Sequence, residues 1–352
     1  MSPRIFWGWL IITVVTVALT VALGLGRETA SFDLAKGEPV FADLRANPDS
    51  AARVEVKSRF GEFTLIRESE GWVTPDRNDY PVSETNIRRL IVGLSDMRFI
   101  EPKTSDPERF RRLEVQDIDK ELADSAYVKV SDGEGKELAE VIIGRPSARF
   151  FGGRANGTYI REPGTNNVWL VSGVTNVQTR LVPWLQREIV EIPANTVAKI
   201  SIGEGETAYS LSRTAADDEA FRISGAPEGR NLDPEKVRPV TRAISGVNFE
   251  DVKLRSELSL PADAKVAEFL TFDGLAVRVR LAEIDRKKWA MFEAIYTGDA
   301  ADESHAAKAA LAAVEDINMR VGSWIYWIPS ATYTNLTRPV DEILVPKEDG
   351  TS

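Results

Sequence analysis

The sequence contains no cysteine and only one histidine. Without cysteine the chain cannot form disulfides, thiolate metal sites or a cysteine nucleophile. The single histidine, His305, leaves little room for histidine-based acid–base catalysis or zinc binding. It stands beside acidic residues at the start of an alanine-rich stretch, and no further ligands are spaced to complete a metal site. We therefore predict a solvated histidine at a helix start, and neither a metal nor a cofactor.

The chain also has fewer basic than acidic residues. Lys and Arg total 44 against 54 Asp and Glu, which gives a net charge of −10. A surface of this sign repels a phosphate backbone, so the composition argues against nucleic-acid binding.

No catalytic motif stands out. The glycine-rich stretch 150–157, "FFGGRANG", lacks the Lys–Ser/Thr ending of a phosphate-binding loop and precedes a predicted strand. Carboxylates are plentiful, but a glycosidase needs two of them on either side of a cleft, and sequence does not give that geometry. We expect a protein that is not an enzyme and assign no catalytic residue. A hydrolase with paired carboxylates remains an alternative.

One long hydrophobic run is present, at residues 5–26, and it contains no charged residue. At about 1.5 Å per residue, a helix of this length spans the roughly 30 Å hydrocarbon core of a bilayer. Trp7 and Trp9 near its start are typical of interfacial anchors. The run predicts a transmembrane signal-anchor helix, with residues 1–4 in the cytoplasm and the rest of the chain outside it. A cleaved signal peptide is the competing interpretation.

Residues 27–52 mix glycine, proline and charge, as expected of a linker. Period-two alternation then begins at Arg53 and predicts two short strands. From Ser83 the apolar spacing changes to that of an amphipathic helix, and strand–turn–strand patterns come after it. We assign residues 53–190 to a first α+β unit with an extra hairpin.

The same order of elements recurs in the second half of the chain. "KISI" at 199–202 stands where "RVEV" stood, at an offset of 146 residues. Asp233 and Pro234 are a favourable start for a second amphipathic helix, which repeats the apolar spacing of the first at an offset of 150 residues. We assign 191–345 to a second unit, with a C-terminal helix and strand, and 346–352 to a tail.

These patterns predict an α+β fold: an N-terminal transmembrane helix followed by two repeated units. Each unit would be a small antiparallel sheet with an amphipathic helix on one face. Two unrelated α+β segments are the alternative, because few residues are identical between the two halves.

An ordered series of short motifs resembles a known family. It includes "GEPVFADL", "GWVTPDRNDYPVSETNIRRLI", "EPKTSDPERFRRLEVQD", "GTYIREPGTNNVWLV" and "WIYWIPSATYTNLTRPVDEIL". Together they are similar to an uncharacterised domain family of single-pass, membrane-anchored bacterial envelope proteins, often encoded beside gliding-motility-type ABC transporter subunits. The sequence departs from the pattern at Glu114, where the resemblance leads us to expect glycine, and we expect a changed turn there.

The resemblance implies an accessory subunit of an ABC-type transport system in the inner membrane of a Gram-negative bacterium, anchored through residues 5–26 with its ectodomain in the periplasm. Its partners would be the transporter's permease or sibling envelope subunits. A periplasmic module that binds a glycan or another ligand is the alternative.

Two residues are candidates for contact with a partner. Tyr80 sits in the turn-like "NDYP" before the first predicted helix, and Arg161 sits on a predicted hairpin. Tyrosine and arginine are both enriched at protein interfaces. Ordinary packing is the alternative for each.

Overall fold

The computed structural model describes residues 37–147, 157–173, 177–205, 208–218, 220–225, 227, 229–299 and 304–346. The chain divides into two compact units. The described part of unit 1 comprises residues up to Ser69 together with Glu84–Thr179, and unit 2 comprises Glu70–Ser83 and the residues from Arg180 onward. The stretch 70–83 therefore belongs with unit 2, although it lies inside the range 53–190 that the sequence assigned to the first unit.

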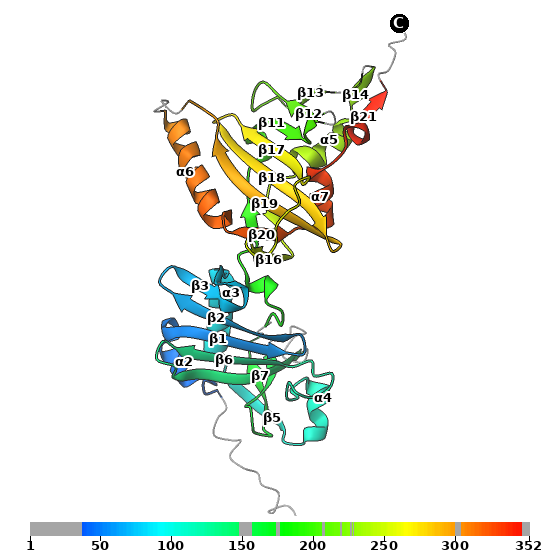
Figure 1. The fold of residues 1–352 in the computed structure, drawn as a ribbon. Coiled ribbons are helices and arrows are strands. Elements are labelled where there is room, and N and C mark those ends of the chain that lie inside the picture. The colour runs from blue at the N-terminus through cyan, green and yellow to red at the C-terminus, as the bar shows by residue number, and fades with distance from the viewer. Residues whose placement is uncertain are drawn as a thin grey trace, which may run out of the picture. The chain divides into compact units, whose positions relative to one another are not determined.

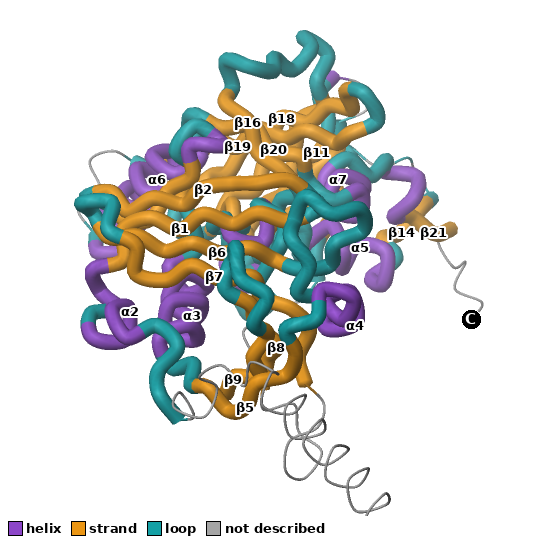
Figure 2. Tube along the Cα trace, turned by 90° about the horizontal axis from the view of Figure 1, so that it is seen from below, coloured by secondary structure: helices purple, strands orange, loops and turns teal. Residues whose placement is uncertain are grey.

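Unit 1 is built around an antiparallel sheet, with α2 (Ala42–Ala46) and α3 (Glu84–Ser95) on one face (Figures 1 and 2). The short helix α4 (Phe110–Leu113) packs on the other face through Phe110, which meets Ile142 and Val168. The strands of the sheet follow the spatial order β2-β1-β6-β7-β8-β9-β5. They are β1 (Ala51–Ser58), β2 (Gly61–Glu68), β5 (Phe99–Thr104), β6 (Ala126–Asp132), β7 (Glu137–Ser147), β8 (Gly157–Arg161) and β9 (Val168–Ser172).

The α3 helix forms because its apolar residues fall three or four positions apart and make one stripe. Ile87, Leu90 and Leu94 are all buried. They complete a core with alternate residues of the strands, such as Val54 and Val56 of β1, which are fully buried. The intervening residues of β1 point to the other face and are polar, so this part of the sheet is solvated on that side. Further along the sheet the same face carries a smaller apolar cluster, in which Ile142 and Val168 pack against Phe110.

Unit 2 contains an eight-stranded antiparallel sheet with the order β13-β12-β11-β17-β18-β19-β20-β16. These strands are β11 (Val197–Ile202), β12 (Tyr209–Ser212), β13 (Arg222–Ser224), β16 (Asp251–Leu254), β17 (Lys265–Thr271), β18 (Leu275–Ile284), β19 (Lys287–Tyr296) and β20 (Trp324–Trp327). Shorter strands are β3 (Gly71–Thr74), β4 (Tyr80–Pro81), β10 (Glu188–Val190), β14 (Arg230–Leu232), β15 (Val247–Asn248) and β21 (Leu344–Pro346). The helices are α5 (Pro234–Thr241), α6 (His305–Val321) and α7 (Ser330–Leu336).

The α5 helix begins as its sequence predicts. The Asp233 side chain accepts a hydrogen bond from the backbone N–H of Glu235, and Pro234 occupies the first helical position. The α6 helix starts at His305 behind an N-cap at Ser304 and packs against β19.

The two units share one strand order: β2-β1-β6-β7-β8-β9-β5 corresponds to β12-β11-β17-β18-β19-β20-β16. The register agrees as well. In unit 1 the cross-strand partners are Val56–Val128–Val141 and, two residues further along β7, Ile143–Ile160–Trp169–Pro102. In unit 2 they are Ile202–Ala267–Val279 and then Leu281–Ala290–Tyr326–Val252. The first and last members of these series are 146 and 150 residues apart in sequence, the same offsets that relate the predicted strands and helices.

The expected fold class is wrong, because the described chain is mostly antiparallel β-sheet and its sheets are not small. The reason is that each unit pairs strands from distant parts of its sequence, such as β5 with β9, which local periodicity does not reveal.

Among the described residues no helix is long and apolar enough to cross a membrane. The predicted transmembrane segment, residues 5–26, lies outside the described residues.

Candidate interaction site

Unit 1 contains a cavity of about 350 Å³ beside β7. This volume falls within the range of small-molecule and side-chain pockets. The described residues that line it are Val40, Phe41, Ala42, Asp43, Phe99, Glu137, Leu138, Ala139, Glu140, Val141, Ile160, Glu162, Asn167 and Trp169.

The cavity exists because β8 is shorter than β7. The β7–β8 register runs from Ile142 to Ser147, so residues 137–141 of β7 extend beyond the end of β8. On the other side of β7, β6 pairs with this stretch as usual. One edge of residues 137–141 therefore has no partner strand among the described residues, and α2 forms the wall nearby by packing against β7.

The chain before α2 is fixed by the start of β5. The N–H of Gly37 donates to the carbonyl of Phe99 at 2.7 Å, and the N–H of Phe99 donates to the carbonyl of Glu38 at 3.0 Å. The N–H of Val40 donates to the carbonyl of Met97 at 3.0 Å. These backbone bonds place residues 40–43 against the cavity.

Aromatic rings form its apolar wall. The rings of Phe99 and Trp169 lie 4.7 Å apart between centroids, tilted by 55°. Trp169 lies opposite Ile160 on the neighbouring strand, so ring and aliphatic side chain occupy one face of the sheet. Neither aromatic side chain is fully buried, which leaves apolar ring surface facing the cavity.

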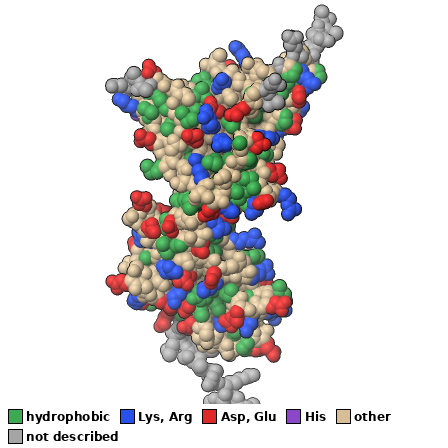
Figure 3. All heavy atoms as spheres, in the orientation of Figure 1, with side chains coloured by type: hydrophobic (Ala, Val, Ile, Leu, Met, Phe, Trp, Pro, Cys, Tyr) green, Lys and Arg blue, Asp and Glu red, His purple; other side chains and the backbone are tan. Residues whose placement is uncertain are grey.

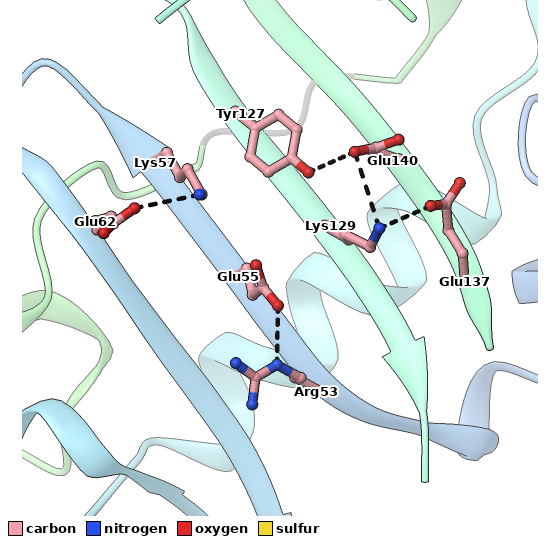
Figure 4. A network of polar contacts seen from close by, with 8 residues as sticks. All are labelled: Arg53, Glu55, Lys57, Glu62, Tyr127, Lys129, Glu137 and Glu140. Carbon is pink, nitrogen blue, oxygen red and sulfur yellow. Dashed lines mark hydrogen bonds and ion pairs between the residues drawn. The ribbon is translucent and has the colours of Figure 1, made fainter. Parts of the chain in front are cut away.

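The rim of the cavity is acidic and joins a polar network on the solvated face of the sheet (Figure 4). Lys129 binds Glu137 at 2.9 Å and Glu140 at 4.0 Å. The Tyr127 hydroxyl donates to Glu140 at 2.5 Å. Burial and the hydrogen bond to Glu140 together raise the pKa of Tyr127 above its ordinary value. The hydrogen bond to Glu137 raises the pKa of Lys129.

The network continues across β1 and β2. Figure 4 shows Lys57 beside Glu62 and Arg53 beside Glu55 on these strands. The distances are 3.2 Å for Lys57–Glu62 and 2.9 Å for Arg53–Glu55. Figure 3 shows the same mixing of signs on the face that it draws, where acidic and basic side chains alternate without a large patch of either. Alternating charge of this kind keeps a sheet face solvated and orders its side chains.

Four carboxylates and no basic side chain are among the described residues that line the cavity. Three of the carboxylates have partners outside it: Glu137 and Glu140 as above, and Asp43, which binds Lys136 at 2.7 Å. The fourth, Glu162, is exposed. An aromatic wall with an acidic rim suits a ligand group that is apolar or aromatic and has a positive charge beside it.

Tyr80, predicted as a partner contact, lies in the core of unit 2 and is 5% exposed. Its ring meets Phe249, Trp324 and Tyr326 edge-on, with centroids 5.4, 4.9 and 6.4 Å away. Its hydroxyl donates to the carbonyl of Gln186 at 3.1 Å. Burial raises the pKa of Tyr80 to about 12.

Arg161, the other predicted contact, is 2% exposed in unit 1. Its guanidinium donates to the carbonyls of Val115 and Thr165, each at 2.8 Å, and pairs with Asp117. It also stacks over the ring of Phe110 at 4.7 Å. The arginine thus ties the turn after α4 to the β8–β9 hairpin, and the structure does not bring Arg161 and Tyr80 together in one site.

Sequence reasoning did not single out the cavity residues. For Phe99 the sequence offered one indication of a special position, because this phenylalanine recurs as Phe249 at an offset of 150 residues. Trp169 gave none beyond its place in a predicted hairpin. Among the described residues no three His, Asp or Glu side chains gather as they would to hold a metal, and His305 lies exposed at the start of α6.

A family model described as "Domain of unknown function (DUF4340)" matches residues 72–268, which is more than half of the chain and includes parts of both units. A comparison with curated proteins found no match.

Proposed function

We propose that this chain, which belongs to the DUF4340 family of domains of unknown function, is a non-enzymatic accessory subunit of an ABC-type transport system of the gliding-motility kind. In this proposal residues 5–26 attach it to the inner membrane of a Gram-negative bacterium, and the two units lie in the periplasm. There it contacts the transporter's permease or sibling envelope subunits.

The cavity of unit 1 is the observation that carries the proposal. A pocket with an aromatic wall and an acidic rim, beside a strand edge that lacks a partner strand among the described residues, is suited to receive part of another protein. Tyr127 and Lys129 already engage Glu137 and Glu140, so these carboxylates serve to order a surface, which supports a binding role over a catalytic one.

The sequence supports the proposed location. The run at 5–26 has the length and the tryptophans of a membrane anchor, and the net charge of −10 does not favour nucleic acid as a partner.

Co-purification tests the proposal. The full chain, tagged after Ser352, would be expressed at its native level, briefly crosslinked, extracted from membranes with mild detergent and purified. We expect an ABC permease, its ATPase or sibling envelope subunits to be enriched over a control purification of an unrelated inner-membrane protein with the same tag. Recovery of none of these, with the chain intact in the eluate, would count against the proposal.

A further inference from the structure

In unit 2, the residues that correspond to part of the cavity wall surround the ring of Tyr80. The tyrosine arrives on an extended segment that pairs with residues 184–186: the N–H of Ser83 donates to the carbonyl of Trp184 at 2.8 Å. The N–H of Gln186 donates to the carbonyl of Pro81 at 3.0 Å. The segment therefore adds to the unit in the manner of a short strand, with its aromatic side chain as the anchor.

The shared register shows where unit 1 has a binding position, or seat, equivalent to the one that Tyr80 occupies in unit 2. Tyr326, which meets the Tyr80 ring, corresponds to Trp169, and Trp324 corresponds to Asn167 two positions earlier. Phe249, the third ring partner of Tyr80, corresponds to Phe99. All three unit 1 residues line the cavity. The ring pair is also repeated, since Phe249–Tyr326 lie 5.4 Å apart and Phe99–Trp169 lie 4.7 Å apart.

Unit 1 differs from unit 2 by being more polar around this seat. Phe292, which packs on Tyr326 with 6.0 Å between centroids, corresponds to Glu162. Asn167 replaces the indole of Trp324. The seat in unit 1 therefore keeps two aromatic rings for an aromatic side chain and adds a carboxylate and an amide, which prefer a charged or hydrogen-bonding neighbour.

The edge of β7 indicates that the segment bound at the cavity is extended. In unit 2, β18 pairs with β19 over its whole length, from Leu275 to Ile284. In unit 1 the corresponding edge of β7 is left without a strand over residues 137–141 among the described residues. An extended segment can use the free backbone groups of such an edge while its side chain enters the pocket.

In the bound segment, a basic residue near the aromatic one would also find an acidic partner in unit 1. In unit 2 Arg77, three residues before Tyr80, binds Asp251 with 3.0 Å between Nε and Oδ1. The register places Glu101 of β5 at the position of Asp251. Unit 1 thus repeats the acidic partner together with the aromatic pair, although Glu101 now binds Lys103.

We propose that the unit 1 cavity receives an extended segment of a partner protein, in which an aromatic residue enters between β7 and the Phe99–Trp169 pair and a nearby arginine or lysine binds the acidic rim. The proposal rests on the proposed function, because the partner is a subunit of the same transport complex. A second copy of this chain is the weaker candidate, because its own 70–83 segment is already used in its unit 2.

The probe is a peptide built on the segment that fills the seat in unit 2. It has the sequence TPNRNNYPVS, which is residues 74–83 with both aspartates replaced by asparagine so that it is cationic. The peptide is amidated at its C-terminus and labelled with tetramethylrhodamine, which is neutral overall, so that it stays cationic. Its binding to the purified full chain is measured by fluorescence anisotropy. Matched peptides carry alanine in place of tyrosine, or citrulline, the neutral analogue of arginine.

We expect saturable binding that is about tenfold or more weaker for the alanine peptide, since burial of an aromatic side chain contributes at least about 1.4 kcal/mol. We expect the citrulline peptide to bind several-fold more weakly at low salt, with a smaller difference at high salt. Equal affinity of all three peptides, or no saturable binding, would overturn the proposal.

Paired variants locate the peptide. Ala42 and Ala46 are both exposed on α2, but only Ala42 lines the cavity. Ala42→Trp should block the mouth and weaken binding about tenfold or more, whereas Ala46→Trp should leave it within about twofold. Glu162→Lys should weaken binding of the cationic peptide, and Glu121→Lys, an exposed change outside the cavity, should not. If Ala42→Trp binds the peptide as tightly as Ala46→Trp, the cavity is not the site.

Two further outcomes identify other occupants. Self-association of the full chain that Ala42→Trp abolishes would assign the seat to a second copy and overturn the partner assignment. Equal displacement of the peptide by arginine ethyl ester and by the unlabelled peptide would point to a small cation instead and would equally overturn it. The assay uses no transporter, so peptide binding can fail while co-purification succeeds, and the two proposals are tested separately.

Discussion

Tyr80 meets Phe249 edge to face across 5.4 Å, although residues 84–179, which belong to unit 1, lie between them in the chain. The contact shows that unit 2 is completed by a segment, residues 70–83, that precedes most of unit 1 in the chain. It also explains why Tyr326 and Phe249 are buried in unit 2, while their counterparts in unit 1, Trp169 and Phe99, line a cavity.

Loss of the Tyr80 ring should destabilise unit 2 strongly. Tyr80→Ala removes a buried aromatic side chain and should lower the free energy of unfolding by about 3–5 kcal/mol. Tyr80→Phe keeps the ring but leaves the carbonyl of Gln186 without its donor, at a cost of about 1 kcal/mol. Urea unfolding followed by circular dichroism measures both. Equal stability of the alanine and phenylalanine variants would contradict the packing role.

The buried tyrosines should make unit 2 sensitive to alkali. Burial raises the pKa of Tyr80 and of Tyr209 to about 12, whereas in the unfolded chain each ionises near 10.0. Between these values the unfolded state loses its protons first, so the contribution is complete below pH 10 and is lost as pH rises toward 12. Urea midpoints at pH 8, 10 and 11 measure the decline. The double variant Tyr80→Phe/Tyr209→Phe should decline less steeply, and an identical slope would contradict the assignment.

Arg161 should be essential to the stability of unit 1 even though it lies on a hairpin. Arg161→Ala removes three polar contacts at a fully buried position and should cost about 3–5 kcal/mol. Arg161→Lys should rescue little, because an ammonium cannot reproduce the guanidinium's fork of donors. Arg111→Ala on the exposed side of α4 is the control and should change stability by less than about 0.5 kcal/mol. Similar urea midpoints for the two alanine variants would be the contrary result.

Gly144 should not tolerate a side chain. A Cβ there would lie 2.4 Å from the carbonyl oxygen of Leu113 and 2.6 Å from a methyl of Val115. Gly144→Ala therefore forces the turn after α4 away from β7 and should cost about 1–3 kcal/mol. At Gly133 a Cβ would meet only Ala52, at 3.9 Å, so Gly133→Ala should fold with nearly wild-type stability. Thermal unfolding of the pair tests this, and equal melting temperatures would refute the close approach.

Local patterns in the sequence predicted several elements of each unit and their order, although α2 lies in the range 27–52 that was predicted to be a linker. The α3 stripe, the α5 start at Asp233 and the strands offset by 146 residues all depend on neighbouring residues, so periodicity and capping reveal them. The size of the sheets depends on pairings between distant strands, which no local pattern encodes.

The candidate site could not be predicted for a related reason. Tyr80 looked exposed because Asn78 and Asp79 mark a turn, and both do adopt positive φ, at 52° and 61°. The turn leads directly into a short strand, β4, that enters the core of unit 2. The cavity likewise arises because β7 is longer than β8. The sequence pattern of a hairpin does not indicate the residue at which the pairing of its two strands ends.

The departure at Glu114 has a structural consequence that can be measured. Glu114 ends α4 with φ 58° and ψ 38°, a left-handed conformation in which glycine is favoured and a residue with a Cβ is strained. Glu114→Gly should relieve this strain and stabilise unit 1 by about 0.5–1 kcal/mol, after allowing for the greater flexibility of glycine in the unfolded chain. Glu68→Gly, at the exposed end of β2, should instead destabilise by about 0.5–1 kcal/mol, because glycine there brings only the entropic cost. Urea unfolding distinguishes the two signs, and destabilisation by both substitutions would show that the Glu114 side chain contributes more than its backbone strain costs.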